Sequence, residues 1–251
     1  MHRTARQAAV MLVATIVLGL SSSCSKKETI RFRMTVHVET PKGLRTGSSV
    51  MEISAWENSF ALNGHVRGRS FKGEAISVDL PSNRTLFALI VTERPASFQI
   101  FDIALDTLDP NYNFDWVESI ARTKSERKSR ESAIVSPFRS LGLTKQIQSG
   151  VPFRSNYPML VTFRDLNTPA SVERIDPQNL GASFGPGYSI KAITVEMTDQ
   201  PLTQKIAQKL PWLRAYWARS SLIPNPPDYP EDTIESEIRL LGASGFSTER
   251  P

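Results

Sequence analysis

The chain has 251 residues, of which 40% are hydrophobic and 22% are charged. This balance is typical of a folded globular protein, and it excludes a chain that is disordered throughout, a collagen-like chain and a coiled coil. The length suffices to bury a sizeable core in one domain or in two small ones. Cys24 is the only cysteine, which excludes an intramolecular disulfide framework and a cysteine-rich metal site.

The first 24 residues have the pattern of an export signal. Arg3 and Arg6 precede an uncharged, mostly apolar run over residues 8–20, and three serines then lead to Cys24. A basic start, a short apolar core and small residues predict a secretory signal peptide over residues 1–23. A transmembrane helix is the alternative, but the run has 13 residues, whereas a membrane span takes about 20.

The sequence LSSSC at residues 20–24 resembles the cleavage box of bacterial lipoprotein signals, in which the cysteine sulfur receives a diacylglyceryl group. The usual leucine stands three residues before the cysteine, whereas here it stands four before it. The resemblance implies a mature chain that begins at Cys24, with residues 24–29 as a lipidated tether. A plain cleaved signal with a free thiol is the alternative. An aspartate after the cysteine favours inner-membrane retention in this class, so Ser25 favours the outer membrane.

Acylation would make the lipid bilayer the first expected partner. Each buried CH2 contributes about 0.8 kcal/mol, and two or more acyl chains hold a protein stably on a membrane. Loss of the leader removes two basic residues, which leaves 28 basic against 25 acidic residues and lowers the net charge from +5 to +3. The remaining charge excess is a weak argument for binding nucleic acid, so we expect no nucleic-acid partner.

The first half of the mature chain predicts an antiparallel sheet. Residues 30–40 alternate between apolar and polar side chains, as a strand with one wet face does. A turn follows at residues 41–43, and Asn63-Gly64 is a strong hairpin signal. Further strands are expected over residues 49–56, 74–80 and 85–91. The last of these is almost continuously apolar, which predicts burial on both of its faces.

The second half mixes helices and strands. The pattern predicts helices over residues 96–108, 115–134 and 202–217, a short helical piece within 169–180, a glycine-rich turn at 181–187, and strands over 158–164 and 189–198. Asp115 should cap the second helix, and Pro211 should kink or divide the third. We therefore expect a single α+β domain over residues 30–223, with a mostly antiparallel sheet packed against two or three helices, and a loose proline-rich tail over residues 224–251.

Four blocks, at residues 31–50, 72–90, 160–185 and 193–199, resemble a family of uncharacterised lipoproteins found mainly in Gram-negative bacteria. The resemblance implies an exported protein that is anchored to a membrane and faces the periplasm. It implies no activity and carries over no catalytic residue.

The sequence contains parts of a catalytic motif and of a metal site, and neither is complete. Residues 181–185 match the G-x-S-x-G nucleophile elbow, which needs a downstream histidine. The mature chain has only His37 and His65, both upstream, so we interpret the motif as a glycine turn. The two histidines lack a nearby third ligand, and we therefore expect no metal.

A third fragment resembles the start of a calcium-binding loop. Asp109, Asn111, Asn113 and Asp115 have the spacing of calcium ligands, but Phe114 stands where the EF-hand needs glycine. Aspartate and asparagine also satisfy backbone donors in turns, so we interpret these residues as turn formers and a helix cap.

One aromatic and basic segment could form a contact surface. It contains Trp212, Arg214, Tyr216 and Trp217. These residue types are enriched in partner-binding hot spots and at membrane interfaces, so a partner or membrane contact is one interpretation. Packing of the segment over the sheet is the interpretation that we favour.

The sequence favours a non-enzymatic binding or assembly module of the cell envelope, without a cofactor. The alternative is an envelope hydrolase that uses a carboxylate site. Asp102 and Asp106 are its candidates, because their spacing places both on one face of the predicted helix. Such pairs more often lie on the protein surface as solvated charges.

Overall fold

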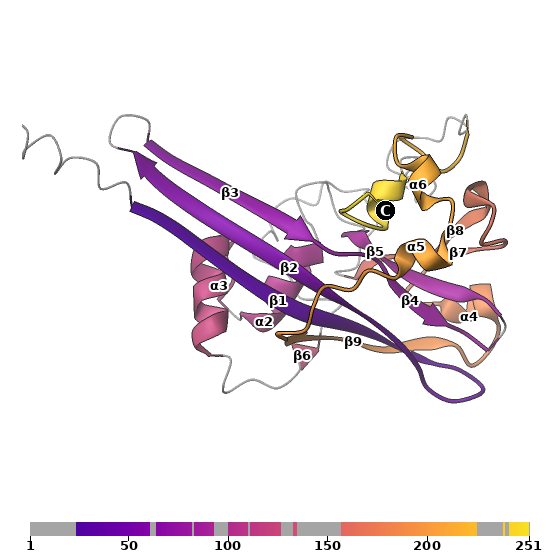
Figure 1. The fold of residues 1–251 in the computed structure, drawn as a ribbon. Coiled ribbons are helices and arrows are strands. Elements are labelled where there is room, and N and C mark those ends of the chain that lie inside the picture. The colour runs from indigo at the N-terminus through magenta and orange to yellow at the C-terminus, as the bar shows by residue number, and fades with distance from the viewer. Residues whose placement is uncertain are drawn as a thin grey trace, which may run out of the picture.

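The computed structural model describes the chain from Cys24 onward with several gaps. The described residues are 24–60, 64–81, 83–92, 100–109, 111–126, 133–134, 157–224, 238 and 241–250. Two antiparallel sheets and several short helices make an α+β fold, as predicted (Figure 1). The predicted signal peptide lies outside the described residues.

The large sheet has five strands in the order β3-β2-β1-β9-β6. Its strands are β1 (Cys24–Glu39), β2 (Arg45–Phe60), β3 (Gly64–Lys72), β6 (Ala133–Ile134) and β9 (Ser189–Met197). The small sheet has the order β4-β5-β7-β8. Its strands are β4 (Ile76–Asp79), β5 (Thr85–Thr92), β7 (Pro158–Phe163) and β8 (Val172–Ile175).

The β1–β2 hairpin is the longest feature of the fold. The two strands pair from Val38 opposite Arg45 to Cys24 opposite Ser59. The predicted turn between them is confirmed, because the Gly43 amide donates to the Thr40 carbonyl over 2.9 Å. The prediction of a tether over residues 24–29 is wrong, since these residues pair with β2 and extend β1. Their polar composition hid the strand, because this end of the sheet lies away from the core.

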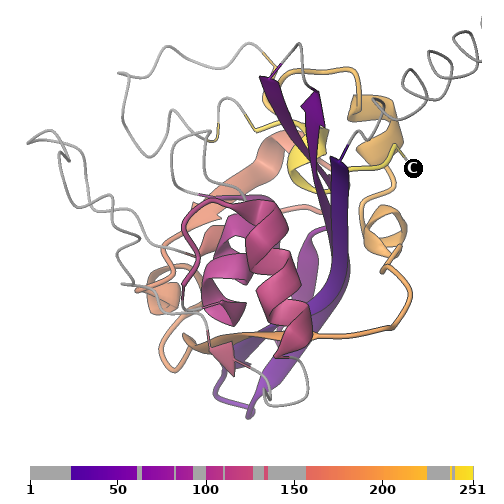
Figure 2. The ribbon, with the colours of Figure 1, turned by 90° about the vertical axis from the view of Figure 1, so that its left-hand side faces the viewer.

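A first core lies on the inner face of the large sheet. Alternate β1 side chains such as Phe32, Met34 and Val36 are fully buried there, against helices α2 (Ile100–Leu108) and α3 (Trp116–Ser125) and one face of the small sheet. Figure 2 shows α2 and α3 side by side against the strands. The outer face of the large sheet carries the polar residues of the alternation, as predicted.

A second core lies on the opposite face of the small sheet. Phe87, Phe163 and Trp212 meet there with Phe246 from the C-terminal end of the chain. Because both faces of the small sheet are covered, β5 and β7 are buried almost throughout, which confirms the prediction for residues 85–91.

The helices follow the sequence signals in part. Pro211 divides the predicted helix 202–217 into α5 (Ile206–Lys209) and α6 (Leu213–Tyr216). The piece expected within 169–180 is the short 3-10 helix η2 (Pro169–Ser171), which leads into β8. A five-residue helix α4 (Leu180–Phe184) replaces the first half of the predicted glycine turn. The predicted helix 115–134 ends earlier, because Ala133 and Ile134 pair with β9 as strand β6.

The prediction of a loose tail over residues 224–251 is wrong for its last part. Residues 241–250 contain a short 3-10 helix, η3 (Ala243–Gly245), and Phe246 is fully buried. The Ala75 amide donates to the Phe246 carbonyl over 2.7 Å, and Glu74 forms a bridge with Ser247. Residues 225–237 lie outside the described part of the chain.

Candidate functional site

The two carboxylates proposed for a hydrolase are buried in the first core. Asp102 is 0% exposed and Asp106 is 6% exposed. The Tyr112 hydroxyl and the Trp116 indole both donate to Asp102 Oδ1, the indole over 3.1 Å. Burial, and then the charge and hydrogen bond of Asp102, raise the pKa of Tyr112. The carboxylate of Asp102 therefore orders the helix-to-loop connection, and the interpretation of a solvated surface pair is wrong.

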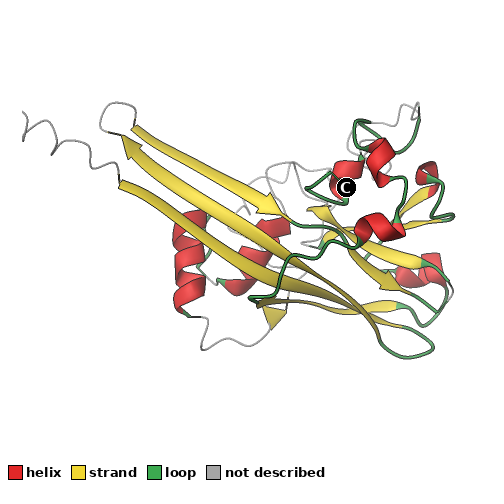
Figure 3. Ribbon diagram, viewed as in Figure 1, coloured by secondary structure: helices red, strands yellow, loops and turns green. Residues whose placement is uncertain are grey.

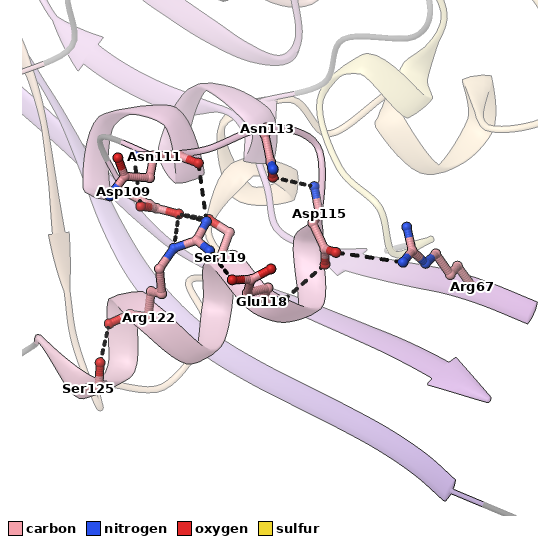
Figure 4. Close-up of polar contacts among 9 residues, drawn as sticks. All are labelled: Arg67, Asp109, Asn111, Asn113, Asp115, Glu118, Ser119, Arg122 and Ser125. Carbon is pink, nitrogen blue, oxygen red and sulfur yellow. Dashed lines mark hydrogen bonds and ion pairs between the residues drawn. The ribbon is translucent and has the colours of Figure 1, made fainter. Parts of the chain in front are cut away.

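Asp109 is the centre of a second polar cluster, which joins α2 to α3 (Figure 4). Its Oδ2 accepts from the Ser119 hydroxyl over 2.6 Å and from the Arg122 guanidinium over 2.8 Å. The Asn111 amide donates to Oδ1 over 3.0 Å. Burial raises the pKa of Asp109, but these hydrogen bonds, led by that from Arg122, outweigh burial and hold the pKa below its ordinary value. Asp109 is thus an anionic anchor for α3.

The neighbouring residues act as a turn and a helix cap, which confirms that interpretation of the calcium-like spacing. Asn113 accepts from the Asp115 amide over 3.2 Å. Asp115 accepts from the Glu118 amide over 3.1 Å and so caps α3. Within the described ranges, no group of three or more histidine, cysteine, aspartate or glutamate side chains is arranged to hold a metal ion.

The G-x-S-x-G segment is not a nucleophile elbow. That motif places the serine on a sharp turn between a strand and a helix. Ser183 lies inside α4 instead, where its carbonyl accepts from Arg84 over 2.6 Å. The bend comes after the helix, at Gly185 and Gly187, which both have positive φ. His37 lies on the outer face of the large sheet, within 3.2 Å of the Thr194 hydroxyl. The His65 side chain lies outside the description.

The aromatic segment near the C-terminus packs over the small sheet. Trp212 is 8% exposed, and its indole donates to the Leu166 carbonyl over 2.7 Å. Tyr216 and Trp217 are partly buried against the second core. Arg214 is exposed. Trp212 therefore packs over the sheet, as the favoured interpretation has it, and the alternative of an exposed contact does not hold for this residue.

Neither of two hollows that open on the described surface is lined by Asp102 or Asp106. The first has a volume of about 310 Å³ and lies between Glu74, α5 and the C-terminal segment. Both oxygens of Glu74 accept backbone amides of Lys205 and Ile206, at 2.7 to 3.1 Å. Glu74 therefore fastens the start of α5, which gives this carboxylate a role within the fold.

The second hollow, of about 530 Å³, lies beside β1 where β9 ends. Arg31, Glu52 and Lys124 contribute to its lining. Arg31 binds Glu52 over 2.8 Å, and Lys124 binds Glu28 over 2.6 Å. Arg31, Glu52 and Lys124 are therefore already paired within the protein.

The feature that sequence reasoning missed is an arm at the end of the large sheet. We use "arm" for residues 24–31 of β1, residues 52–60 of β2 and the whole of β3. Its strands reach beyond the helices that cover the sheet (Figure 3). The hairpin signal at Asn63-Gly64 falls between the paired strands β2 and β3. The mixed polar sequence of β3 does not indicate a strand, because residues 66–72 are exposed or half-buried without a regular alternation.

Comparisons with known proteins assign neither a family nor a function to the chain. The chain matches no protein-family model, no curated protein and no solved structure. None of the helices in the described ranges combines the length and apolar character that a membrane crossing requires. What the protein does must therefore be inferred from its own sequence and geometry.

Proposed function

We propose that the protein is an exported lipoprotein of a Gram-negative cell envelope, anchored through Cys24 and facing the periplasm as a non-enzymatic binding or assembly module. The observation that carries the proposal is the sequence of the first 24 residues, with a basic start, an apolar run, small residues and then Cys24. Ser25 favours the outer membrane.

The place of Cys24 in the fold is compatible with this anchor. Its backbone begins β1 and lies opposite Ser59 at the end of the arm. An acyl chain on Cys24 would therefore attach to the sheet directly, without an intervening spacer. Two or more such chains suffice for stable attachment to a bilayer.

The anchor is tested with a Cys24→Ser variant of the full chain in the native host. We expect loss of radiolabelled palmitate, loss of the protein from the membrane fraction and a changed mobility on a gel. A Ser23→Ala variant is the matched control, because alanine keeps the cleavage box small and should leave labelling unchanged. Unchanged labelling and membrane association of Cys24→Ser would refute the lipoprotein assignment.

The burial of Asp102 and Asp106 favours a binding role over a hydrolase. Asp102 and Asp106 are buried and line neither hollow, whereas the outer face of the large sheet presents a broad polar surface. Cross-strand pairs such as Arg33–Glu196, at 2.6 Å, order its side chains without help from a covering helix among the described elements. A preordered polar face can bind a partner with a small loss of side-chain entropy.

The binding role is tested with a photo-crosslinking residue at Thr35 or Ser48, which face each other across β1 and β2. We expect a discrete adduct in intact envelopes from these positions. The same residue at Lys42, in the exposed hairpin turn, is the control and should give none. The absence of any adduct from the sheet, or the same adduct from all three positions, would contradict a specific contact through this face.

A further inference from the structure

The arm brings two separate chain segments to one end of the molecule. Cys24 lies opposite Ser59 at the start of β1, and Phe60 lies opposite Gly64 where β2 passes to β3. The backbone at Cys24, the end of β2 and the start of β3 therefore share one end of the large sheet (Figure 1). A surface that holds Cys24 would also lie close to the ends of these two strands.

This end carries an excess of positive charge. The last residues of the three strands, 24–28, 55–59 and 65–69, contain four basic and two acidic side chains. Both acids already bind a cation, Glu28 at Lys124 and Glu57 at Arg67, over 2.6 and 3.2 Å. Lys26 and Lys27 are exposed and form no ion pair with another described residue. The unpaired charge at the end of the arm is thus positive.

The inner face of the arm positions one of these cations, Arg69. The Arg69 guanidinium lies 4.1 Å from the ring centre of Trp116 and 5.1 Å from that of Phe101. Arg69 remains exposed, so these rings orient its charge without removing it from solvent.

The outer face of the same end carries an aromatic and an aliphatic residue. Trp56 is partly exposed and lies across Gly68, where an added Cβ would come within 2.3 Å of the indole. Lys27 lies opposite Trp56 on the neighbouring strand. Val66 is 49% exposed and is one of two large hydrophobic side chains so exposed among the described residues. Tryptophan is enriched where proteins meet the membrane–water interface, and basic side chains are attracted to anionic headgroups.

The opposite end of the β1–β2 hairpin supplies an internal comparison. It also carries two exposed basic residues, Lys42 and Arg45, and an exposed aliphatic residue, Leu44, which is 46% exposed. It lacks a tryptophan and lies away from Cys24. The two ends therefore differ in the features that a membrane contact requires.

We propose that the end of the arm is a membrane-binding surface that docks on anionic lipid headgroups, with Lys26, Lys27 and Arg69 near the phosphates and Trp56 at the interface. The proposal rests on the proposed function, because anchoring at Cys24 sets this end against the bilayer. Basic residues near an anionic surface each add to the attraction, and the attraction falls with salt.

The test uses the chain from residue 24 onward, which contains every described residue, with Cys24→Ser so that no acyl chain contributes. Sedimentation measures its binding to vesicles of phosphatidylcholine with 30% phosphatidylglycerol and to vesicles of phosphatidylcholine alone. We expect binding to the anionic vesicles, with a loss of about tenfold or more in the Lys26→Glu/Lys27→Glu variant. The Lys42→Glu/Arg45→Glu variant changes the net charge equally and should bind within twofold of the parent.

Unchanged circular dichroism and melting temperature must accompany each variant, and Lys26→Gln/Lys27→Gln replaces the charge reversal if that variant unfolds. Absent binding to anionic vesicles, or an equal loss from both ends of the hairpin, would overturn the proposal. Because this assay contains no acyl chain, its failure leaves the result of palmitate labelling at Cys24 intact, and the reverse also holds.

A second readout reports the contact itself. Brominated lipids quench tryptophans that reach the bilayer interface. We expect quenching in the parent chain on anionic vesicles and its loss in Trp56→Phe, whereas Trp217→Phe should retain it. Quenching that survives Trp56→Phe would place another surface on the membrane and would contradict the docking of the arm.

Discussion

The small sheet and the arm of the large sheet are built on opposite principles. The small sheet is covered on both faces, and β7 is buried over its whole length. In the arm, residues 66–72 of β3 are exposed or partly exposed, and ion pairs such as Arg31–Glu52 cross the outer face. Apolar burial contributes about 25 cal/mol per Å², whereas exposed ion pairs contribute little. The small sheet should therefore carry the stability, while the arm is free to carry a surface for binding.

The largest effect is expected from Phe246→Ala. Phe246 is fully buried and contacts Phe87, Phe163 and Trp212 in the second core. Its truncation should lower the free energy of unfolding by about 4 kcal/mol, through lost burial and the cavity left behind.

Urea unfolding followed by circular dichroism measures this loss, with Val66→Ala as the matched control in the arm. Val66 is 49% exposed, so its truncation should cost less than about 0.5 kcal/mol. Equal effects of the two substitutions would show that the C-terminal segment does not belong to the core.

The next effect concerns the contact between the two sheets. At Gly47, β2 passes so close to β4 that an added Cβ would lie 2.1 Å from the Ser77 carbonyl oxygen. Gly47→Ala should therefore destabilise by about 2–3 kcal/mol, because the two backbones must move apart.

Gly181→Ala is the control for Gly47→Ala. A Cβ at Gly181 meets its nearest neighbour at 3.7 Å, and the position is helical, so alanine should be neutral or stabilising by about 0.5 kcal/mol. Thermal unfolding of both variants distinguishes the close approach of the sheets from a general intolerance of alanine.

The same contrast explains which parts of the fold could be predicted from the sequence. Strict alternation in residues 30–40 predicts a strand that is buried on one face. The apolar run at 85–91 predicts a strand that is buried on both faces. Both predictions are confirmed. Residues 24–29 and β3 lack such a signal, since residues 25–29 and 66–72 are exposed or half-buried, and their sequence indicates a tether and no strand.

The candidate sites failed for a different reason. The spacing of Asp102 and Asp106 gives their common helix face but not what covers it, and Tyr112 and Trp116 reach Asp102 from beyond the helix. The composition of residues 212–217 allows both an exposed contact and packing over a sheet, and the structure places Trp212 in the second core. Local turn and cap chemistry at Asp115 depends on near neighbours, and it was predicted correctly.

A medium effect is expected at Asp109, which anchors α3 beneath the arm. Its hydrogen bonds lower its pKa from the ordinary value of 3.8, so its stabilising contribution is complete above that pH and is lost as the pH falls through the lowered value. Asp109→Asn should cost about 2 kcal/mol at pH 7, because Arg122 loses its buried anionic partner.

The difference between the parent and Asp109→Asn should shrink as urea unfolding is repeated below about pH 4. Glu118→Gln is the control, because Glu118 also binds Arg122, at 2.7 Å, but is 63% exposed. It should change stability little. A difference that stays constant down to pH 3 would show that the charge of Asp109 does not stabilise the fold.

The smallest effect is expected on the outer face of the large sheet, at the Arg33–Glu196 pair. The side chains are 27% and 38% exposed, so solvent screens their attraction. A double-mutant cycle with Arg33→Ala and Glu196→Ala should give a coupling energy of about 0.5 kcal/mol, reduced further in 0.5 M salt. A coupling above about 2 kcal/mol that resists salt would mean that the pair is desolvated in the isolated protein. The outer face would then already be covered in the isolated protein. A covered face could not bind a partner, and its access to solvent would no longer explain the polar residues of β1.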